Sequence, residues 1–220
     1  MNRFFYAFLI FPLSLAATIA GASVPFDGDW KEQRFSLFAS NEYLQRGHAV
    51  DVASDGTVSL LWQRVPSYDR DAIQARWTWE VTESVPPTDL TQKGGDDRNL
   101  SLYFVFLPSD LVAEAEERGI RWILKQSSVR VLLYTWGGRD GDTGLIAASP
   151  YMNNQGAMFI KRPAGTGRYT EEVNLRSDYA RAFGGDAGAL VGLAISADSD
   201  DTDTHVRATL SDLALIGPSN

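Results

Sequence analysis

The stretch Arg76-Trp-Thr-Trp-Glu-Val81 alternates polar or charged residues with large apolar residues at every second position. Successive side chains of a β-strand point to opposite faces, so this alternation predicts a strand that buries Trp77, Trp79 and Val81. The same period of two recurs from Leu100 to Phe106. These two stretches indicate a protein built mainly from β-strands.

Further strand-like runs extend on both sides of these two. They are rich in β-branched and aromatic residues, and turn-forming clusters such as Ser54-Asp-Gly56 and Pro86-Pro87 separate them. They cover His48–Ala53, Thr57–Val65, Val129–Trp136, Ala157–Lys161, Tyr169–Leu175, Leu190–Ala197 and Val206–Ile216. Alternation within each run predicts strands with one buried and one solvated face.

Two short segments have helical signals instead. Ser109–Arg118 begins with Ser and Asp and ends before Gly119, and Ser177–Phe183 begins with a capping Ser and ends before Gly184. The whole pattern predicts one all-β sandwich of about eight to ten strands with two short helical insertions. A closed barrel is the alternative arrangement of the same strands.

The N-terminus predicts export from the cytoplasm. Arg3 precedes the apolar run Phe4–Ala17, and Ala20-Gly-Ala22 has the small residues of a cleavage site, so residues 1–22 are expected to be a signal peptide. The apolar run is shorter than the roughly 20 residues of a membrane-spanning helix, although an uncleaved anchor is the alternative. Cleavage would leave a single domain, residues 23–220, in the bacterial periplasm or outside the cell.

Composition excludes several classes of protein. The chain has no cysteine, which excludes a disulfide scaffold and thiolate metal sites. Its formal net charge is −8 and its basic residues are not clustered, so nucleic acid is not an expected partner. After removal of the signal peptide, no remaining segment is apolar enough to cross a bilayer.

The turn Asp198-Ser-Asp-Asp-Thr-Asp203 places four carboxylates between two predicted strands. Carboxylates crowded in one turn repel each other unless water or a cation screens them. Ca²⁺ takes several oxygen ligands, so Asp198, Asp200, Asp201 and Asp203 are candidate calcium ligands. The alternative is a solvated acidic turn.

A second set of candidates concerns ligand binding. Arg98 follows Gly94-Gly-Asp-Asp97 and has a guanidinium suited to anchoring a polar ligand, or else to pairing with one of these aspartates. Tyr134 and Trp136 lie at the end of a predicted strand, where an exposed ring would stack on a sugar. Burial of both rings in a core is the alternative.

The order of several motifs resembles a bacterial exported family catalogued as domain of unknown function 3047. The similar stretches are Trp77-Thr-Trp-Glu-Val81, Pro87-Thr-Asp-Leu90, Lys93-Gly-Gly-Asp-Asp-Arg98, Leu102-Tyr-Phe-Val-Phe106, Leu133-Tyr-Thr-Trp-Gly137, Asp178-Tyr-Ala-Arg-Ala-Phe-Gly184 and Ala197-Asp-Ser-Asp-Asp-Thr202. The resemblance implies a jelly-roll-like sandwich of the galactose-binding type. It implies no activity and no catalytic residues.

These observations favour an exported, non-catalytic domain that binds a carbohydrate or a cell-envelope component through Arg98, Tyr134 and Trp136, with a structural Ca²⁺ at the acidic turn. One alternative is an enzyme that cleaves glycans with Asp97, Asp198 and Asp200 as its carboxylates. Another is a purely structural protein of the envelope. Two carboxyl groups facing each other across a cleft would favour the enzyme.

Overall fold

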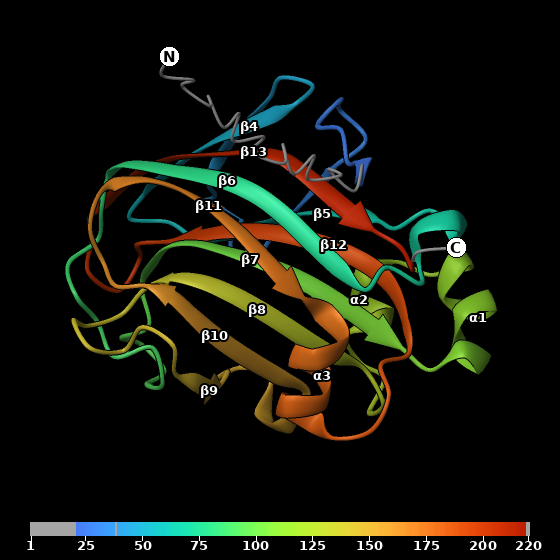
Figure 1. Ribbon diagram of the computed structural model, residues 1–220. Helices are drawn as coiled ribbons and strands as arrows, with labels where there is room; N and C mark the ends of the chain where they lie inside the picture. Colours follow the sequence, from blue (N-terminus) through green and yellow to red (C-terminus); the bar gives the residue numbers. More distant parts are fainter. Residues whose placement is uncertain (1–20, 38, 219–220) are drawn as a thin grey trace, which may run out of the picture.

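The computed structural model describes residues 21–37 and 39–218, which form two β-sheets packed face to face (Figure 1). This arrangement confirms the predicted sandwich, and the barrel alternative is wrong. The predicted signal peptide lies outside the described residues except for Gly21 and Ala22. None of the helices in the described ranges has the length and apolar character needed to span a bilayer.

The first sheet has six strands in the order β11-β6-β13-β4-β3, with the short β1 beside β13. The bounds of its strands are β1 Ala22–Ser23, β3 Glu42–Gln45, β4 Ala49–Asp55, β6 Gln74–Glu83, β11 Gly167–Asn174 and β13 His205–Ile216. The longer strands match the predicted runs. β1 and β3 lack a predictive signal because each is too short to show a period.

The second sheet has seven strands in the order β2-β5-β12-β7-β8-β10-β9. The bounds are β2 Lys31–Arg34, β5 Ser59–Arg64, β7 Arg98–Leu107, β8 Arg130–Gly137, β9 Ile146–Ala148, β10 Gly156–Arg162 and β12 Ala189–Asp198. At its centre, β7 pairs antiparallel with β12 and β8, whereas β8 and β10 are parallel.

The helical segments are short, as predicted. The first predicted insertion contains a 3₁₀ turn and then α1 (Val112–Glu117), and a further short helix, α2 (Ile120–Ile123), follows it. The second insertion is α3 (Leu175–Phe183), which joins β11 to β12. Its N-cap is Asn174, whose side chain accepts a hydrogen bond from the Ser177 backbone, so the expected cap at Ser177 is wrong.

The main core lies between the two sheets and is unusually aromatic. Trp77 and Trp79 project into it from β6 and are fully buried, as their alternation predicted. Their rings pack against Tyr134 and Trp136 of the opposing sheet, with centroids 5.4 and 5.6 Å apart. The facing aromatic side chains therefore fix how the two sheets meet.

A second apolar cluster covers the outer face of the seven-stranded sheet. Tyr103, Val105, Val131 and Leu133 point away from the main core and are buried by other residues, among them Ile123 of α2. Every residue of β7 is buried. The expectation of half-buried strands is thus wrong for β7, and likewise for β8 and β12, because a layer of short helices and loops covers the second face of this sheet.

Candidate ligand pocket and acidic cluster

The outer face of the seven-stranded sheet carries a pocket with a volume of about 460 Å³. Its floor consists of side chains from five strands, and α2 with the residue that follows it, Leu124, forms part of its cover. The floor residues are Leu60, Val105, Val131, Leu133, Met158 and Ala194. A pocket of this volume is large enough to hold a small organic ligand.

One end of the pocket is polar, and Arg98 is at its centre. Strict alternation along β7 would place Arg98 on the same face as Leu100, which lies in the main core. The pairing of β7 with β8 is irregular between these two residues, and its pairing with β12 shifts register near Asp198. Such bulges re-aim side chains, and here Arg98 lies on the outer face with Tyr103.

Gly137 makes room for this arrangement, since it is the residue of β8 that pairs with Arg98. A Cβ atom at Gly137 would lie only 2.8 Å from the Cβ atom of Arg98. Any larger residue at position 137 would therefore push the guanidinium from its place. The glycine at the end of β8, where the glycine-rich loop begins, is therefore needed for the position of Arg98 at the polar end of the pocket.

The guanidinium of Arg98 pairs with two carboxylates. Its Nη1 atom lies 2.9 Å from Asp96 Oδ2 and 3.0 Å from Asp198 Oδ2, and Nη2 donates a hydrogen bond of 3.2 Å to the Tyr103 hydroxyl. Arg98 exposes 8% of its surface and Asp198 6%. The predicted choice between a ligand anchor and an internal ion pair is therefore not exclusive, because the paired Arg98 also lines the pocket.

Two polar atoms at this end remain without a partner among the described residues. They are Nε of Arg98 and Oδ1 of Asp198, both shielded from solvent. A buried polar atom without a hydrogen bond costs free energy, so such atoms are rare unless a ligand or water completes them. The polar end therefore has one unused donor and one unused acceptor.

Burial also changes the protonation of these carboxyl groups. Desolvation raises the pKa of Asp198 to about 8, although Arg98 acts to lower it, and a hydrogen bond with Asp200 raises it further. Desolvation likewise raises the pKa of Asp96 above its ordinary value, again against the effect of Arg98. Asp198 therefore holds its proton near neutral pH.

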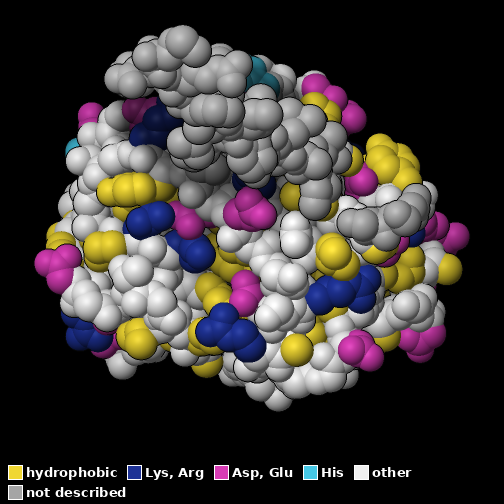
Figure 2. Space-filling model, viewed as in Figure 1, with side chains coloured by type: hydrophobic (Ala, Val, Ile, Leu, Met, Phe, Trp, Pro, Cys, Tyr) yellow, Lys and Arg dark blue, Asp and Glu magenta, His cyan; other side chains and the backbone are white. Residues whose placement is uncertain are grey.

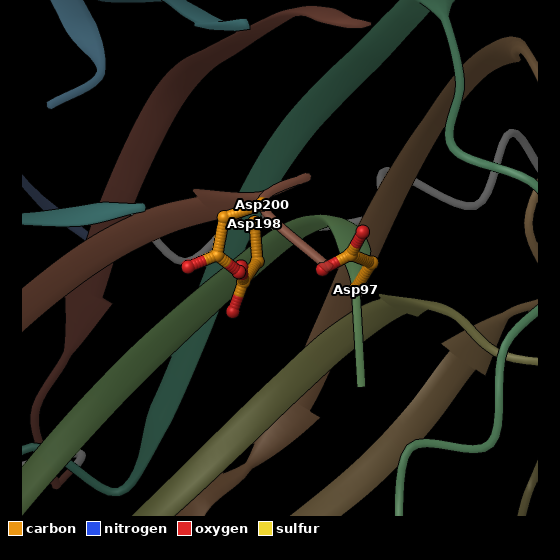
Figure 3. A group of neighbouring side chains, drawn as sticks. All are labelled: Asp97, Asp198 and Asp200. Atoms are coloured by element: carbon orange, nitrogen blue, oxygen red, sulfur yellow. The ribbon is translucent and has the colours of Figure 1, made fainter. Parts of the chain in front are cut away.

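Asp97 approaches the same cluster from the start of β7, while Asp198 and Asp200 come from the end of β12 (Figure 3). One carboxylate oxygen from each of the three lies within 4.8 Å of the others. Asp97 also accepts hydrogen bonds from the backbone N–H groups of Asp201 (3.3 Å) and Thr202 (2.8 Å). It therefore holds the acidic turn against β7.

The other two predicted calcium ligands lie outside this group. Asp201 is exposed and contributes its backbone N–H to Asp97. Asp203 is also exposed and has a left-handed backbone, with φ at 51°. The structure instead brings together Asp97, Asp198 and Asp200, the three carboxylates that the sequence analysis grouped only for the glycan-cleaving alternative.

Tyr134 and Trp136 do not lie at the pocket. Their exposed fractions are 0% and 1%, and both rings belong to the main core between the sheets. A ring without exposure offers no face to a sugar, so their assignment as stacking contacts is wrong. The reason is their position in β8, which sends even-numbered side chains inward and Val131 and Leu133 to the pocket.

Sequence reasoning missed several residues of the polar end. Tyr103, Ser196 and Tyr151 line the pocket, and Tyr103 and Ser196 have hydroxyl oxygens 3.4 Å apart. The signal that could have identified Tyr103 is its place in β7, where the side chains of both faces of the strand are largely apolar. Such a strand is typical of burial on both faces, and Tyr103 then brings a hydroxyl into the second layer.

The surface elsewhere has mixed charge. On the face shown in Figure 2, acidic and basic side chains lie among each other with small hydrophobic areas between them. The described residues include exposed ion pairs, such as Arg168 with Glu80. Exposed pairs of this kind contribute little to stability. The basic side chains on the face in Figure 2 form no continuous basic surface.

The sequence profile of the family described as "Protein of unknown function (DUF3047)" matches residues 28–214. The chain therefore belongs to this family, which confirms the resemblance inferred from its motifs. No curated protein matches the chain significantly.

Among solved structures, the chain is similar to the xyloglucanase domain of NopAA, a type three effector from Sinorhizobium fredii, in complex with cellobiose. The TM-score is 0.48 and the identity 7%, over 90% of this chain and 96% of that domain. The agarase AgWH50C matches with a TM-score of 0.36 and 9% identity, over 91% of this chain and 26% of its own. At these scores the similarities carry no argument about activity.

Proposed function

We propose that this member of the DUF3047 family is an exported, non-catalytic domain that binds a carbohydrate or another hydroxylated component of the cell envelope. The observation that carries the proposal is the pair of unpartnered atoms, Arg98 Nε and Asp198 Oδ1, at the polar end of the pocket. The other buried polar atoms without partners among the described residues belong to Gln63, Trp77 and Trp79, which do not line this pocket.

The chemistry of this pair selects a hydroxyl group. A hydroxyl accepts one hydrogen bond and donates another, so ligand hydroxyls suit both the donor Arg98 Nε and the acceptor Asp198 Oδ1. The match also holds if Asp198 is protonated, because a hydroxyl accepts as readily as it donates. A carboxylate ligand would satisfy Arg98 but repel the ionised aspartates around it.

The geometry favours binding over glycan cleavage. Asp97 is occupied by the backbone of the acidic turn, and Asp198 is paired with Arg98. Glycosidases hold their two carboxyl groups about 5 Å or more apart, on either side of the scissile bond. Asp97, Asp198 and Asp200 have carboxylate oxygens within 4.8 Å of one another, which is closer than that spacing.

The proposal is tested by calorimetric titration of the mature protein with mono- and oligosaccharides. Asp198→Asn, which keeps the shape of the side chain but changes its hydrogen bonding, should weaken binding by about tenfold or more. Arg207→Gln removes an arginine far from the pocket and serves as the control, with unchanged affinity. Equal affinity of wild type and Asp198→Asn would contradict the assignment of the polar end.

A second proposal concerns a structural Ca²⁺ at the acidic cluster. It is supported by the approach of Asp97, Asp198 and Asp200 to within 4.8 Å and by the free Oδ1 atom of Asp198. A cation there would share Asp198 with the guanidinium of Arg98, which neutralises part of the same charge. Oxygen-only ligands favour Ca²⁺ over transition metals.

Thermal melting with EDTA, Ca²⁺, Mg²⁺ and Zn²⁺ tests this second proposal. Ca²⁺ at about a hundred times its dissociation constant should stabilise the fold by about 2.7 kcal/mol. Asp200→Asn should abolish the effect, whereas Asp203→Asn should keep it, since Asp203 lies outside the cluster. Melting that no ion changes would identify the cluster as a solvated turn held together by Arg98.

A further inference from the structure

We infer that the ligand is an amphiphile, with a hydroxyl-bearing head at the Arg98–Asp198 end and an alkyl or similarly apolar segment in the rest of the pocket. The inference rests on the proposed function and deepens it. A free sugar would use only the polar end, whereas the pocket continues well beyond it along the sheet.

The charged part of the lining is confined to one end of the pocket. Its residues lie close together, at or just before the start of β7 and around the end of β12, and are Asp96, Arg98, Asp198 and Asp200. The accessible lining beyond them is largely apolar and comes from Phe35, Leu60, Leu124 and Met152, with Ser149 and Gln155 also part of it. The floor below, which includes Val105, Val131, Leu133 and Met158, is at most 2% exposed. Charge and apolar surface are therefore separated along one cavity.

A sugar ring placed over this apolar lining would lose its water there. Its hydroxyl groups would find few donors or acceptors, because Phe35, Leu60 and Met152 offer none, and burying an unpaired hydroxyl is unfavourable. An alkyl segment has no such groups, and its transfer from water to an apolar wall is favourable. The lining thus selects against additional hydroxyls and in favour of methylene groups.

The size of the cavity agrees with a ligand larger than a single hydroxylated head. A volume of about 460 Å³ equals the share of about fifteen water molecules at roughly 30 Å³ each. The side chains of Phe35 and Tyr151 line the same pocket and are 65% and 59% exposed. Two exposed aromatic rings beside the pocket give an entering apolar chain a surface to contact.

The test is calorimetric titration with a series of n-alkyl glucosides from butyl to decyl, each below its micelle concentration. Affinity should rise about fourfold for every added methylene group until the chain fills the pocket. The matching n-alkanols should bind more weakly at each length, because they carry one hydroxyl and not a sugar head.

Ala194→Leu is the variant that tests the location. Ala194 forms part of the aliphatic floor, so a larger side chain there should remove the gain from the longer alkyl chains while short ones still bind. Ala53→Leu makes the same change on a strand of the other sheet and should leave the whole series unchanged. Melting curves of both variants establish that they are folded.

The outcomes separate this inference from the proposed function. Glucoside binding that does not depend on chain length would overturn the amphiphile and retain the hydroxyl site. Alkanols that bind as tightly as the glucosides would overturn the carbohydrate head and retain the apolar segment. A chain-length effect that Ala194→Leu leaves intact would overturn the placement of the alkyl segment, and no binding by any probe would overturn both.

Discussion

The two faces of the seven-stranded sheet are formed by the same strands but differ in how completely they are covered. The inner face packs Phe104, Leu132 and Tyr134 against a second sheet and leaves a closed aromatic core. The outer face packs Val105 and Leu133 against short helices and loops and leaves a pocket. A regular partner layer fills space completely, whereas a cover of short irregular segments leaves a cavity for a ligand.

The largest expected effect compares neighbouring leucines of β8. Leu132→Ala, on the inner face, should lower the free energy of unfolding by about 3–5 kcal/mol, because the closed core cannot collapse around the missing atoms. Leu133→Ala, on the outer face, should cost less, at about 2–3 kcal/mol, since its side chain already borders a cavity. Urea unfolding of both variants measures the difference, and equal costs would contradict the contrast between the faces.

The next effect concerns Arg98, a buried charged residue on the outer face of the sheet. Arg98→Met should destabilise the protein by about 3–5 kcal/mol, because it leaves Asp96 and Asp198 buried without their cation. Arg207→Gln breaks an exposed pair with Asp55 and should cost less than about 1 kcal/mol. Urea unfolding near pH 8.5 gives both values. Equal losses would mean that Arg98 is solvated like a surface residue.

Replacing either of two alanines of β12 by leucine adds volume to one face of the sheet and so tests how tightly that face is packed. Ala197 faces the inner core and Ala194 the pocket. Ala197→Leu should therefore cost about 1–3 kcal/mol through overpacking, while Ala194→Leu should change stability by less than about 1 kcal/mol. Thermal melting of the pair provides the measurement, and a destabilised Ala194→Leu variant would show that the pocket closes in solution.

The smallest effect for a single step is the loss of stability per pH unit, which is confined to the outer face. The pKa of Asp198 is raised in the folded protein to about 8 from 3.8, so the native state holds the proton more tightly. Its contribution to stability is complete below pH 3.8 and is lost as the pH rises to about 8, at about 1 kcal/mol per pH unit. Unfolding in EDTA at several pH values should show this decline in wild type but not in Asp198→Asn.

The sequence predicted most of the sandwich because side chains alternate between the two faces of a β-strand, which gives buried strands a hydrophobic period of two. Trp77 and Trp79 alternate with polar residues and are buried where expected, and the strand from Val129 to Trp136 separates its two sets of side chains as predicted. Gly119 and Gly184 likewise marked the ends of α1 and α3, although the N-cap of α3 is Asn174 and not the expected Ser177. Family membership followed from the order of short motifs spread over the chain.

Tertiary structure alone decided the site. Alternation assigns side chains to faces but does not say which face another layer covers, so Tyr134 and Trp136 are buried and Val131 and Leu133 line the pocket. The irregular pairing of β7 reverses the orientation expected for Arg98, and no local pattern marks it. The meeting of Asp97 with Asp198 depends on strand order, because β7 and β12 are neighbours only once the sheet has formed.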